Sequence, residues 1–548
     1  MEQAVLADGI LTNARILTNW PAMPWATELV WHGGRITHVG GPGSSNGAAG
    51  HGTLTVDLGG RLVLPGLCDS HMHFTNWSLS LQEADLFEVP SLAAMLDRLR
   101  SATANLNEGS WLLGRGWNQA IWPEGRFPTR HDLDSACGHR PTLLYAKSGH
   151  AAVASSSALS QAGLHAGAVA PAGGFVELDD DNKPTGLLLE NPAIGLVEQI
   201  CPAPSASAME TACLQGQTRL HAWGVTSVHD FDGRQGFEAF QRLDRSGQLR
   251  LRAVNHVSQD QFPHALDFGL TGPMRGPWLT VGGLKLFADG ALGPRTAAMA
   301  EPYAGEPDNY GMTVVDKEEM LELVALASSR GIASCVHAIG DRANRDVLDV
   351  FQEVRRQERE AGVTPEERRH RVEHAQVLLE QDISRFAHLG INVAVQPIHA
   401  TQDMAMVDQY WGPRGQYAYA FKSLLSHGTR MAFGSDAPVE TPNPWVGLHA
   451  AVTRRRADGN PGPDGWYPAQ KVDRMSALRA YTVEAAFLEG LERDIGTLAP
   501  GMRADLTVPD RDVLACSPDD LLDTKALLTM AGGEIVHRDP NDRPVVPD

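Results

Sequence analysis

Two histidines separated by one residue, His71 and His73, follow a short apolar run that is interrupted by Pro65 and Gly66. Alternate residues of an extended segment point to the same side, so both imidazoles can face one point. Neutral imidazole is the commonest protein ligand of metal ions. The pair indicates either a divalent metal site or two histidines that serve only in packing, because the motif is weak by itself.

Further polar and ionisable residues stand at the ends of short apolar segments along the chain. They are His229, Asp230, Lys285, Asp289, His337, His374, Gln396 and Asp436. If these segments are the strands of a (β/α)8 barrel, their carboxyl ends converge on one face, where such barrels carry active sites. Chance would scatter these residue types among loops and helix faces, so their recurrence favours the metal site.

The types of candidate ligand restrict the metal. His71, His73, His337 and His374 offer neutral nitrogens, and Asp436 offers a charged oxygen. This mixture suits zinc, with manganese or iron as rivals, and is poor for calcium or magnesium. We therefore expect a divalent transition metal, with zinc favoured.

Lys285 is the unusual member of the set, because an ammonium beside a dication is repelled and is costly to bury. It would be tolerated as a carbamate, the product of the lysine amine and carbon dioxide. A carbamate is anionic and can bridge two metals. The other interpretation is an ammonium paired with Asp289; we favour the carbamate. Two bridged metals would generate hydroxide at neutral pH and polarise a carbonyl oxygen. Asp436 would take the hydroxide proton and pass it to a leaving amine.

From residue 219 onward, apolar segments alternate with helical patterns. We expect strands at Val225–Asp230, Leu251–His256, Gly283–Asp289, Ala333–His337, Arg371–Ala375, Asn392–Pro397 and Arg430–Asp436. One helix is predicted to begin at a capping pair, Asp316 and Glu319, and to end at Gly331. Together with the strand before His71, these repeats predict an α/β fold, a distorted TIM (β/α)8 barrel.

The chain ends are predicted to be β-structure. Short strands are expected at residues 10–18, 28–31, 36–39 and 53–57, and again at 504–508 and 526–536. Chain ends commonly lie close together, so we predict one composite β-sandwich built from residues 1–65 and 491–548. The hydrolase barrel would occupy residues 66–490, with a long insertion at about 75–215 placed as an active-site cover.

The composition narrows the class of protein. With 548 residues, of which 43% are hydrophobic and 20% charged, the chain is typical of soluble globular proteins. A net charge of −20 argues against a nucleic acid or an anionic membrane as the partner. Six scattered cysteines form no C-x-x-C pair, which fits a reducing compartment. We expect a cytoplasmic protein with a small-molecule substrate, and assembly into a homo-oligomer stays open.

Seven stretches of the sequence carry a resemblance. They are Val63–His73, Leu284–Gly290, Val336–Ala343, Val372–Ala375, Phe433–Val439, Gly496–Gly501 and Ala504–Leu506. In these stretches, and over almost its whole length, the chain resembles the amidohydrolase superfamily, in particular the branch that includes the N-substituted formamide deformylases. The resemblance implies a barrel with a flanking β-domain in which His71, His73 and Asp436 hold one metal. His337 and His374 would hold a second, and a carboxylated Lys285 would bridge the two.

Residues that contact the substrate are harder to assign. His150 lies in a segment that resembles a family motif and could hydrogen-bond a substrate carbonyl, or it could be a loop histidine. Trp117 could line an apolar pocket, although packing is favoured. Arg295 could bind a carboxylate, although pairing at the surface is favoured. Asp289 and Glu373 could orient metal ligands.

These observations favour a hydrolase acting on carbon–nitrogen bonds other than peptide bonds. It would cleave an amide or formamide by attack of metal-bound hydroxide. The alternatives on the same fold are a cyclic amide hydrolase and a mononuclear deaminase, which would need one metal and an unmodified Lys285. A non-catalytic regulator is disfavoured, because no member of the ligand set is missing.

Overall fold

The computed structural model describes residues 7–104, 106–107, 109–119, 122–147, 151–171 and 174–542. It divides into two compact units, one formed by Met1–Asn76 with Cys213–Asp548 and the other by Trp77–Ala212. The second unit corresponds to the long excursion that follows the His-x-His pair. Two helices, α1 (Phe74–Ser80) and α6 (Ala206–Ala222), contain the points at which the chain passes from one unit to the other.

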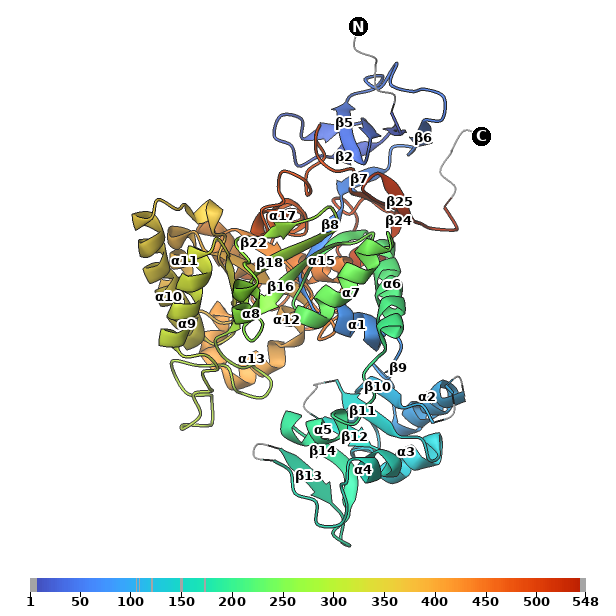
Figure 1. The fold of residues 1–548 in the computed structure, drawn as a ribbon, viewed down its shortest axis with the longest axis vertical. Coiled ribbons are helices and arrows are strands. Elements are labelled where there is room, and N and C mark those ends of the chain that lie inside the picture. The colour runs from blue at the N-terminus through green and yellow to red at the C-terminus, as the bar shows by residue number, and fades with distance from the viewer. Residues whose placement is uncertain are drawn as a thin grey trace. The chain divides into compact units, whose positions relative to one another are not determined.

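Eight parallel strands of the first unit form the barrel (Figure 1). In spatial order they are β8 (Leu67–Met72), β15 (Val225–Asp230), β16 (Arg252–Ser258), β18 (Leu279–Phe287), β19 (Ser334–Ala338), β20 (Arg371–His374), β21 (Asn392–Val395) and β22 (Met431–Phe433). The sheet curls back on itself, because the N–H of Asp436, just after β22, donates to the carbonyl of His71 on β8 at 2.7 Å. The predicted barrel is confirmed. A short strand, β17 (Met274–Arg275), pairs antiparallel with β18.

Helices follow the barrel strands, and their caps explain where they begin. The predicted helix after Asp316 is α9 (Lys317–Ser329), whose first turn is capped by the Asp316 carboxylate accepting from the N–H of Glu319 at 2.8 Å. The remaining helices are α7 (Gly233–Arg245), α8 (Phe262–Asp267), α10 (Asp341–Glu360), α11 (Ile383–Leu389), α12 (Pro397–Gln402), α13 (Met404–Tyr410), α14 (Phe421–Ser426), α15 (Pro444–Thr453), α16 (Arg474–Ala480) and α17 (Val483–Leu488).

Both ends of the chain contribute to two further sheets, and the strands of the two termini lie side by side in Figure 1. One sheet has the order β5 (Arg35–Gly40), β4 (Glu28–His32), β1 (Gly9–Thr12), β6 (Leu54–Asp57). The other has the order β25 (Glu534–Arg538), β24 (Ala526–Ala531), β23 (Leu506–Pro509), β7 (Leu62–Pro65), β2 (Arg15–Leu17), β3 (Trp25–Ala26). Buried residues from both sheets form one hydrophobic cluster, as in a sandwich.

Two of the predicted terminal strands are each divided into two. Residues 526–536 form β24 and the start of β25, which pair with each other. Residues 10–18 form two strands, β1 and β2, that belong to different sheets. The break falls at Asn13, whose φ of 49° lies in the left-handed region that asparagine tolerates better than most residues.

A buried ion pair ties the sandwich to the barrel. The guanidinium of Arg252 on β16 donates to both carboxylate oxygens of Asp505 at 2.5 Å and 2.8 Å, and both side chains are almost fully buried. We expect Asp505→Ala to lower the free energy of unfolding by about 3–5 kcal/mol, because it leaves a buried guanidinium without its counter-charge. Urea denaturation followed by circular dichroism measures this change.

The matched control is Asp512→Ala, which removes the partner of Arg15 in an ion pair whose side chains are 31% and 45% exposed. That change should cost at most about 1 kcal/mol, because water and salt screen exposed pairs. Equal destabilisation by the two substitutions would contradict the role assigned to the buried pair.

The second unit is a sheet covered by four helices. Its strand order is β13 (Phe175–Leu178), β14 (Pro184–Leu189), β12 (Ala151–Ala154), β11 (Thr142–Ala146), β10 (Leu112–Trp117), β9 (Ala84–Asp85). Its helices are α2 (Leu92–Ala104), α3 (Arg130–Cys137), α4 (Ser156–Gln161) and α5 (Asn191–Glu198).

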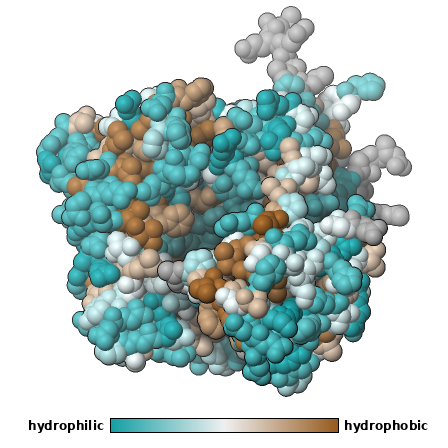
Figure 2. Space-filling view, turned by 60° about the horizontal axis from the view of Figure 1, so that its bottom comes forward, coloured by the Kyte–Doolittle hydropathy of each residue, from teal (hydrophilic) through white to brown (hydrophobic). Residues whose placement is uncertain are grey.

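On the face drawn in Figure 2, hydrophilic residues predominate and hydrophobic residues gather in a few groups. Among the described helices, none combines the length and the apolar character that a membrane crossing requires.

Candidate metal centre

β8 carries His71 and ends at Met72, and His73 follows directly. The side chains of His71 and His73 point to the same place, as those of alternate residues in extended backbone do. The Nε2 atoms of His71 and His73 lie 3.4 Å and 3.6 Å from Oδ1 of Asp436. Their Nδ1 atoms are held from behind, at 2.6 Å from Glu373 and at 3.0 Å from Asp232 respectively. Where a histidine donates its Nδ1–H to a carboxylate, Nε2 keeps a lone pair for a metal.

Asp436 follows β22, and an unusual backbone conformation turns it toward these histidines. Its φ is 59°, in the left-handed region that non-glycine residues seldom adopt. Burial by itself would raise the pKa of the Asp436 carboxyl, but the imidazoles around it, that of His71 above all, hold that pKa well below its usual range. Asp436 is therefore a carboxylate at neutral pH, able to bind a cation or accept a proton.

β19 and β20 contribute His337 and His374, whose ring centres are 4.6 Å apart. Nδ1 of His374 donates to Oε1 of Gln396 at 2.8 Å, and Nε2 of His337 donates to the carbonyl of Gly290 at 2.9 Å. Each ring keeps one nitrogen lone pair. Burial lowers the pKa of both histidines, to about 4 for His337. Both are neutral at pH 7, as metal ligands must be.

One ligand atom from each of His71, His374 and Asp436 lies within 4.8 Å of the other two. Two imidazole nitrogens and a carboxylate oxygen at this spacing form the donor set of a zinc-type site. His73 also reaches the Asp436 oxygen, and the ring of His337 lies against that of His374. The five predicted ligands therefore meet at the carboxyl end of the barrel.

A second buried group, formed by His256, Cys335 and Glu489, has the same spacing. Here the positive charge is already supplied by Arg371. Its guanidinium lies 2.9 Å from the Glu489 carboxylate and 3.0 Å from Nε2 of His256. We therefore interpret this second group as a buried ion-pair network, not as a metal site.

Lys285 on β18 is buried beside the candidate metal ligands. Its Nζ lies 4.3 Å from the ring centre of Phe231 and 4.9 Å from that of Phe287. Within the described parts of the chain, no carboxylate forms an ion pair with it. The expected alternative partner, Asp289, instead accepts backbone N–H groups of Ala298, Ile339 and Gly340 at 2.8–3.0 Å. The ammonium–Asp289 pair considered from the sequence is not formed.

The carboxylate behind His71 belongs to the same buried network. Glu373 accepts from Nε of Arg371 at 2.6 Å as well as from His71, and both Glu373 and Arg371 are fully buried. We expect Glu373→Gln to weaken metal binding about 10- to 100-fold, because the amide no longer fixes the charge and tautomer of His71. Competition with a calibrated chelator measures this affinity.

A second buried histidine–glutamate pair provides the control for that substitution. Nε2 of His370 lies 2.9 Å from Glu358, on the outside of the barrel. Glu358→Gln makes the same chemical change there and should leave metal affinity unaltered. A parallel loss in both variants would mean that the effect of Glu373→Gln is one of folding.

The comparison with known proteins agrees with this geometry. The family model described as Amidohydrolase family matches residues 54–537. The chain belongs to this family. It is 33% identical to the protein LONG AFTER FAR-RED 3 of Arabidopsis thaliana, over 92% of this chain and 87% of that protein. It is 28% identical to an N-substituted formamide deformylase of Arthrobacter pascens, over 96% and 98% of the two chains.

A solved structure supports the fold assignment of this amidohydrolase. The crystal structure of an uncharacterized metal-dependent hydrolase from Pyrococcus horikoshii OT3 matches with a TM-score of 0.77 and 28% identity. The match covers 93% of this chain and 99% of that one. The resemblance to the amidohydrolase superfamily is therefore confirmed.

Unlike the predicted metal ligands, the residues predicted to contact the substrate do not lie together in this amidohydrolase. Trp117 is buried in the core of the second unit, where its Nε1–H donates to the carbonyl of Leu144 at 2.9 Å. Arg295 pairs with the carboxylate of Glu306. Asp289 holds backbone N–H groups, as described above. His150 lies outside the described residues.

Two residues at the site were not predicted from the sequence. Asp232, which holds His73, also accepts from Thr75 and Asn76 at the start of α1. His399 on α12 lies with its Nε2 3.9 Å from Oδ2 of Asp436. The sequence signal for His399 is its position two residues after Pro397, the end of the predicted strand Asn392–Pro397.

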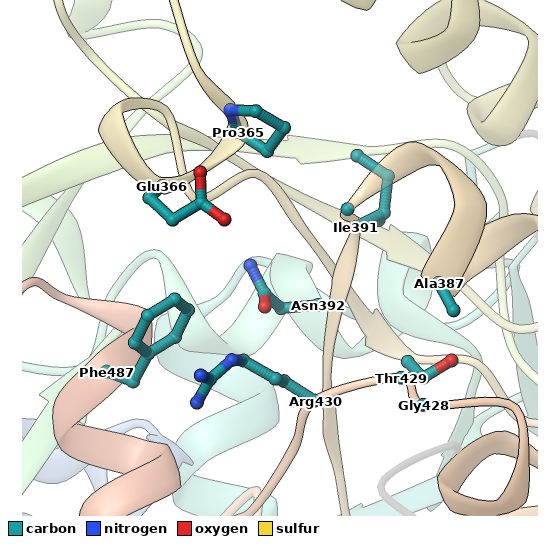
Figure 3. A pocket seen from close by; sticks show the side chains of 10 residues that line it. Pro365, Glu366, Ala387, Ile391, Asn392, Gly428, Thr429, Arg430 and Phe487 are labelled. Atoms are coloured by element: carbon teal, nitrogen blue, oxygen red, sulfur yellow. The ribbon is translucent and has the colours of Figure 1, made fainter.

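A pocket of about 120 Å³ is found at the opposite end of the barrel strands, where Asn392 begins β21 and Arg430 precedes β22. Figure 3 shows Arg430 pointing toward Phe487, and its guanidinium lies 3.8 Å from the centre of that ring. The guanidinium of Arg369 also lies close to Phe487, at 4.2 Å from the ring centre. The pocket contains none of the candidate metal ligands.

Proposed function

We propose that this amidohydrolase cleaves the carbon–nitrogen bond of a small-molecule amide or formamide in a metal-dependent reaction. The observation that carries the proposal is the convergence of His71 and His73 on one oxygen of Asp436, with each Nδ1 fixed by a carboxylate. The name of the Arthrobacter pascens relative, an N-substituted formamide deformylase, supports formamides as the first substrates to test.

The residues present fit a transition-metal centre. His71, His73 and Asp436 would hold one ion, and His337 and His374 would hold a second. The mixture of neutral nitrogens and one carboxylate favours zinc over calcium or magnesium, with manganese and iron as rivals. Lys285 would bridge the two ions as a carbamate, since its Nζ forms no ion pair with a carboxylate among the described residues and burial lowers its pKa toward the neutral amine that reacts with carbon dioxide.

Side chains of the protein would then transfer the protons of the reaction. When bound, the metal would lower the pKa of a water molecule to near neutrality and polarise the substrate carbonyl. Asp436 would accept the proton lost by the attacking water and return it to the departing amine. The side chain of Asp436 is 14% exposed, so water can reach its carboxylate, whereas that of His71 beside it is buried. Glu373 and Asp232 would hold His71 and His73 in the required tautomers.

The test combines metal analysis with a substrate panel. Protein purified without chelator should contain about two transition-metal ions per chain, measured by inductively coupled plasma mass spectrometry. The panel pairs N-substituted formamides with acetamides of the same amine, and adds cyclic amides and aminopurines. Release of free amine from the formamides would support the proposal. One ion per chain with turnover of aminopurines only would replace it with the mononuclear deaminase, and absence of metal uptake would refute both.

A further inference from the structure

Two buried hydrogen-bond donors stand unused where β21 passes into α12. Among the residues that the structure describes, neither Nε2 of Gln396 nor Nε2 of His399 has a hydrogen-bond partner, and both atoms are shielded from solvent. Gln396 is fully buried and His399 is 6% exposed. Leaving a buried donor unpaired is costly, so such atoms are usually satisfied by a group that binds there.

The position of His399 indicates what that group contacts. Its ring lies nearly parallel to that of His374, with the centres 6.4 Å apart. Its Nε2 is 3.9 Å from Oδ2 of Asp436, which is too far for a hydrogen bond between them. A polar atom placed between them, at about 2.9 Å from both Nε2 of His399 and Oδ2 of Asp436, would see these two atoms at an angle of about 85°. The gap between His399 and Asp436 can therefore hold one bound atom, or two atoms of a ligand that are bonded to the same carbon.

Gln396 locates the second unused donor beside the same ligands. Its Oε1 accepts from Nδ1 of His374, so the amide nitrogen is the end that remains unpaired. The two donors are three residues apart in the chain and both adjoin His374. Of the two, His399 is the one that faces Asp436, and a donor in that position is suited to an oxygen that carries developing negative charge.

We propose that His399 is a catalytic residue that contacts the substrate, with its Nε2–H donating a hydrogen bond to the carbonyl oxygen of the amide. This inference rests on the proposed function. Asp436 has to reach both the attacking water and the leaving nitrogen, which are bonded to the same carbon as that oxygen. The Nε2–H of His399, 3.9 Å from the Asp436 carboxylate, is therefore within reach of the carbonyl oxygen of the substrate. The bond strengthens as the oxygen becomes negative in the tetrahedral intermediate.

The first test is His399→Ala in the metal-loaded full chain, assayed with the best formamide of the panel. We expect kcat to fall about 100- to 1000-fold, as for loss of one oxyanion donor, while KM changes far less and metal content stays that of the wild type. His399→Gln keeps an N–H donor and should recover part of the loss. The control is His449→Ala, which removes a buried histidine of α15 whose Nε2 lies 3.4 Å from Asp519; it should keep the wild-type kcat.

A binding measurement separates substrate contact from an indirect role. Methylphosphonate is a tetrahedral anion that imitates the charged intermediate, and calorimetry on the metal-loaded protein gives its affinity. We expect His399→Ala to weaken this affinity in proportion to kcat, with His399→Gln in between. Loss of metal in His399→Ala, or wild-type kcat and wild-type methylphosphonate affinity, would overturn the inference. If the wild type hydrolyses no amide, the proposed function fails before His399 is tested.

Discussion

Replacing Asp436 by asparagine is expected to lower kcat for the best formamide by about 100- to 10,000-fold, the range associated with loss of a general acid–base group. The substitution keeps the size of the side chain and its place after β22. It removes the charge that His71 and His73 approach and the group that would carry the proton from water to the leaving amine. Steady-state kinetics with added metal in excess measure the effect.

Metal content and folding have to be separated from catalysis in this variant. Asparagine is a weaker metal ligand than aspartate, so the metal bound by Asp436→Asn is measured in the same samples. The Asp505→Ala variant provides the comparison for stability, since Asp505 pairs with Arg252 away from the metal ligands. It should keep the wild-type kcat per folded molecule. A kcat for Asp436→Asn equal to that of the wild type would remove Asp436 from the reaction.

The positions of the barrel ligands could be predicted because local pattern and topology agree. Each of β8, β19 and β20 is a short buried strand whose last residues, or the next residue, include a histidine, and parallel strands present those ends on one face. The predicted strand at residues 225–230 matches β15 residue for residue. Neither the ligand positions nor this strand required information on how distant segments pack.

Glu373 was a candidate from the sequence for orienting a metal ligand, but which carboxylate holds which histidine could not be predicted in this way. Glu373 and His71 are 302 residues apart in the chain, and His73 and Asp232 are 159 apart. Nothing in the local pattern around either histidine selects its carboxylate. The same holds for Arg371, which fills the space between Glu373, His256 and Glu489 only once β16, β20 and the segment after α17 have come together. These contacts depend on the register of the closed barrel.

The aromatic surroundings of Lys285 are a further case, and they bear on its chemistry. Sequence reasoning offered Asp289 as the counter-charge, but Nζ lies against the rings of Phe231 and Phe287, and the carboxylates whose charges favour its ammonium form are Glu373 and Asp436. Phe231 also stacks on His71, with ring centres 4.3 Å apart. The amine is therefore held by apolar groups next to the metal ligands, where a neutral amine or an anion facing a metal is less costly than an isolated ammonium.

Lys285→Ala is accordingly expected to reduce the bound metal from about two ions to about one per chain and to lower kcat by at least about 100-fold. The physical reason is that the two ions would lose the anion that bridges them. In the wild type, labelling with carbon-13 dioxide should give a carbamate signal in the carbon-13 spectrum, and this signal should be absent from the variant. Lys317→Ala, which removes a partly exposed lysine paired with Asp349, is the control.

Chemical rescue distinguishes a bridging role of Lys285 from a packing role. The alanine variant leaves space in which a small carboxylate such as acetate or propionate can lie, and a carboxylate is the group that the carbamate would have supplied. If Lys285 bridges two metals, these acids should restore part of both the metal content and the kcat of Lys285→Ala, whereas neutral acetamide should restore neither. Retention of two ions and full activity without any added acid would rule out the bridge and leave the mononuclear mechanism, with Lys285 as an amine held between Phe231 and Phe287.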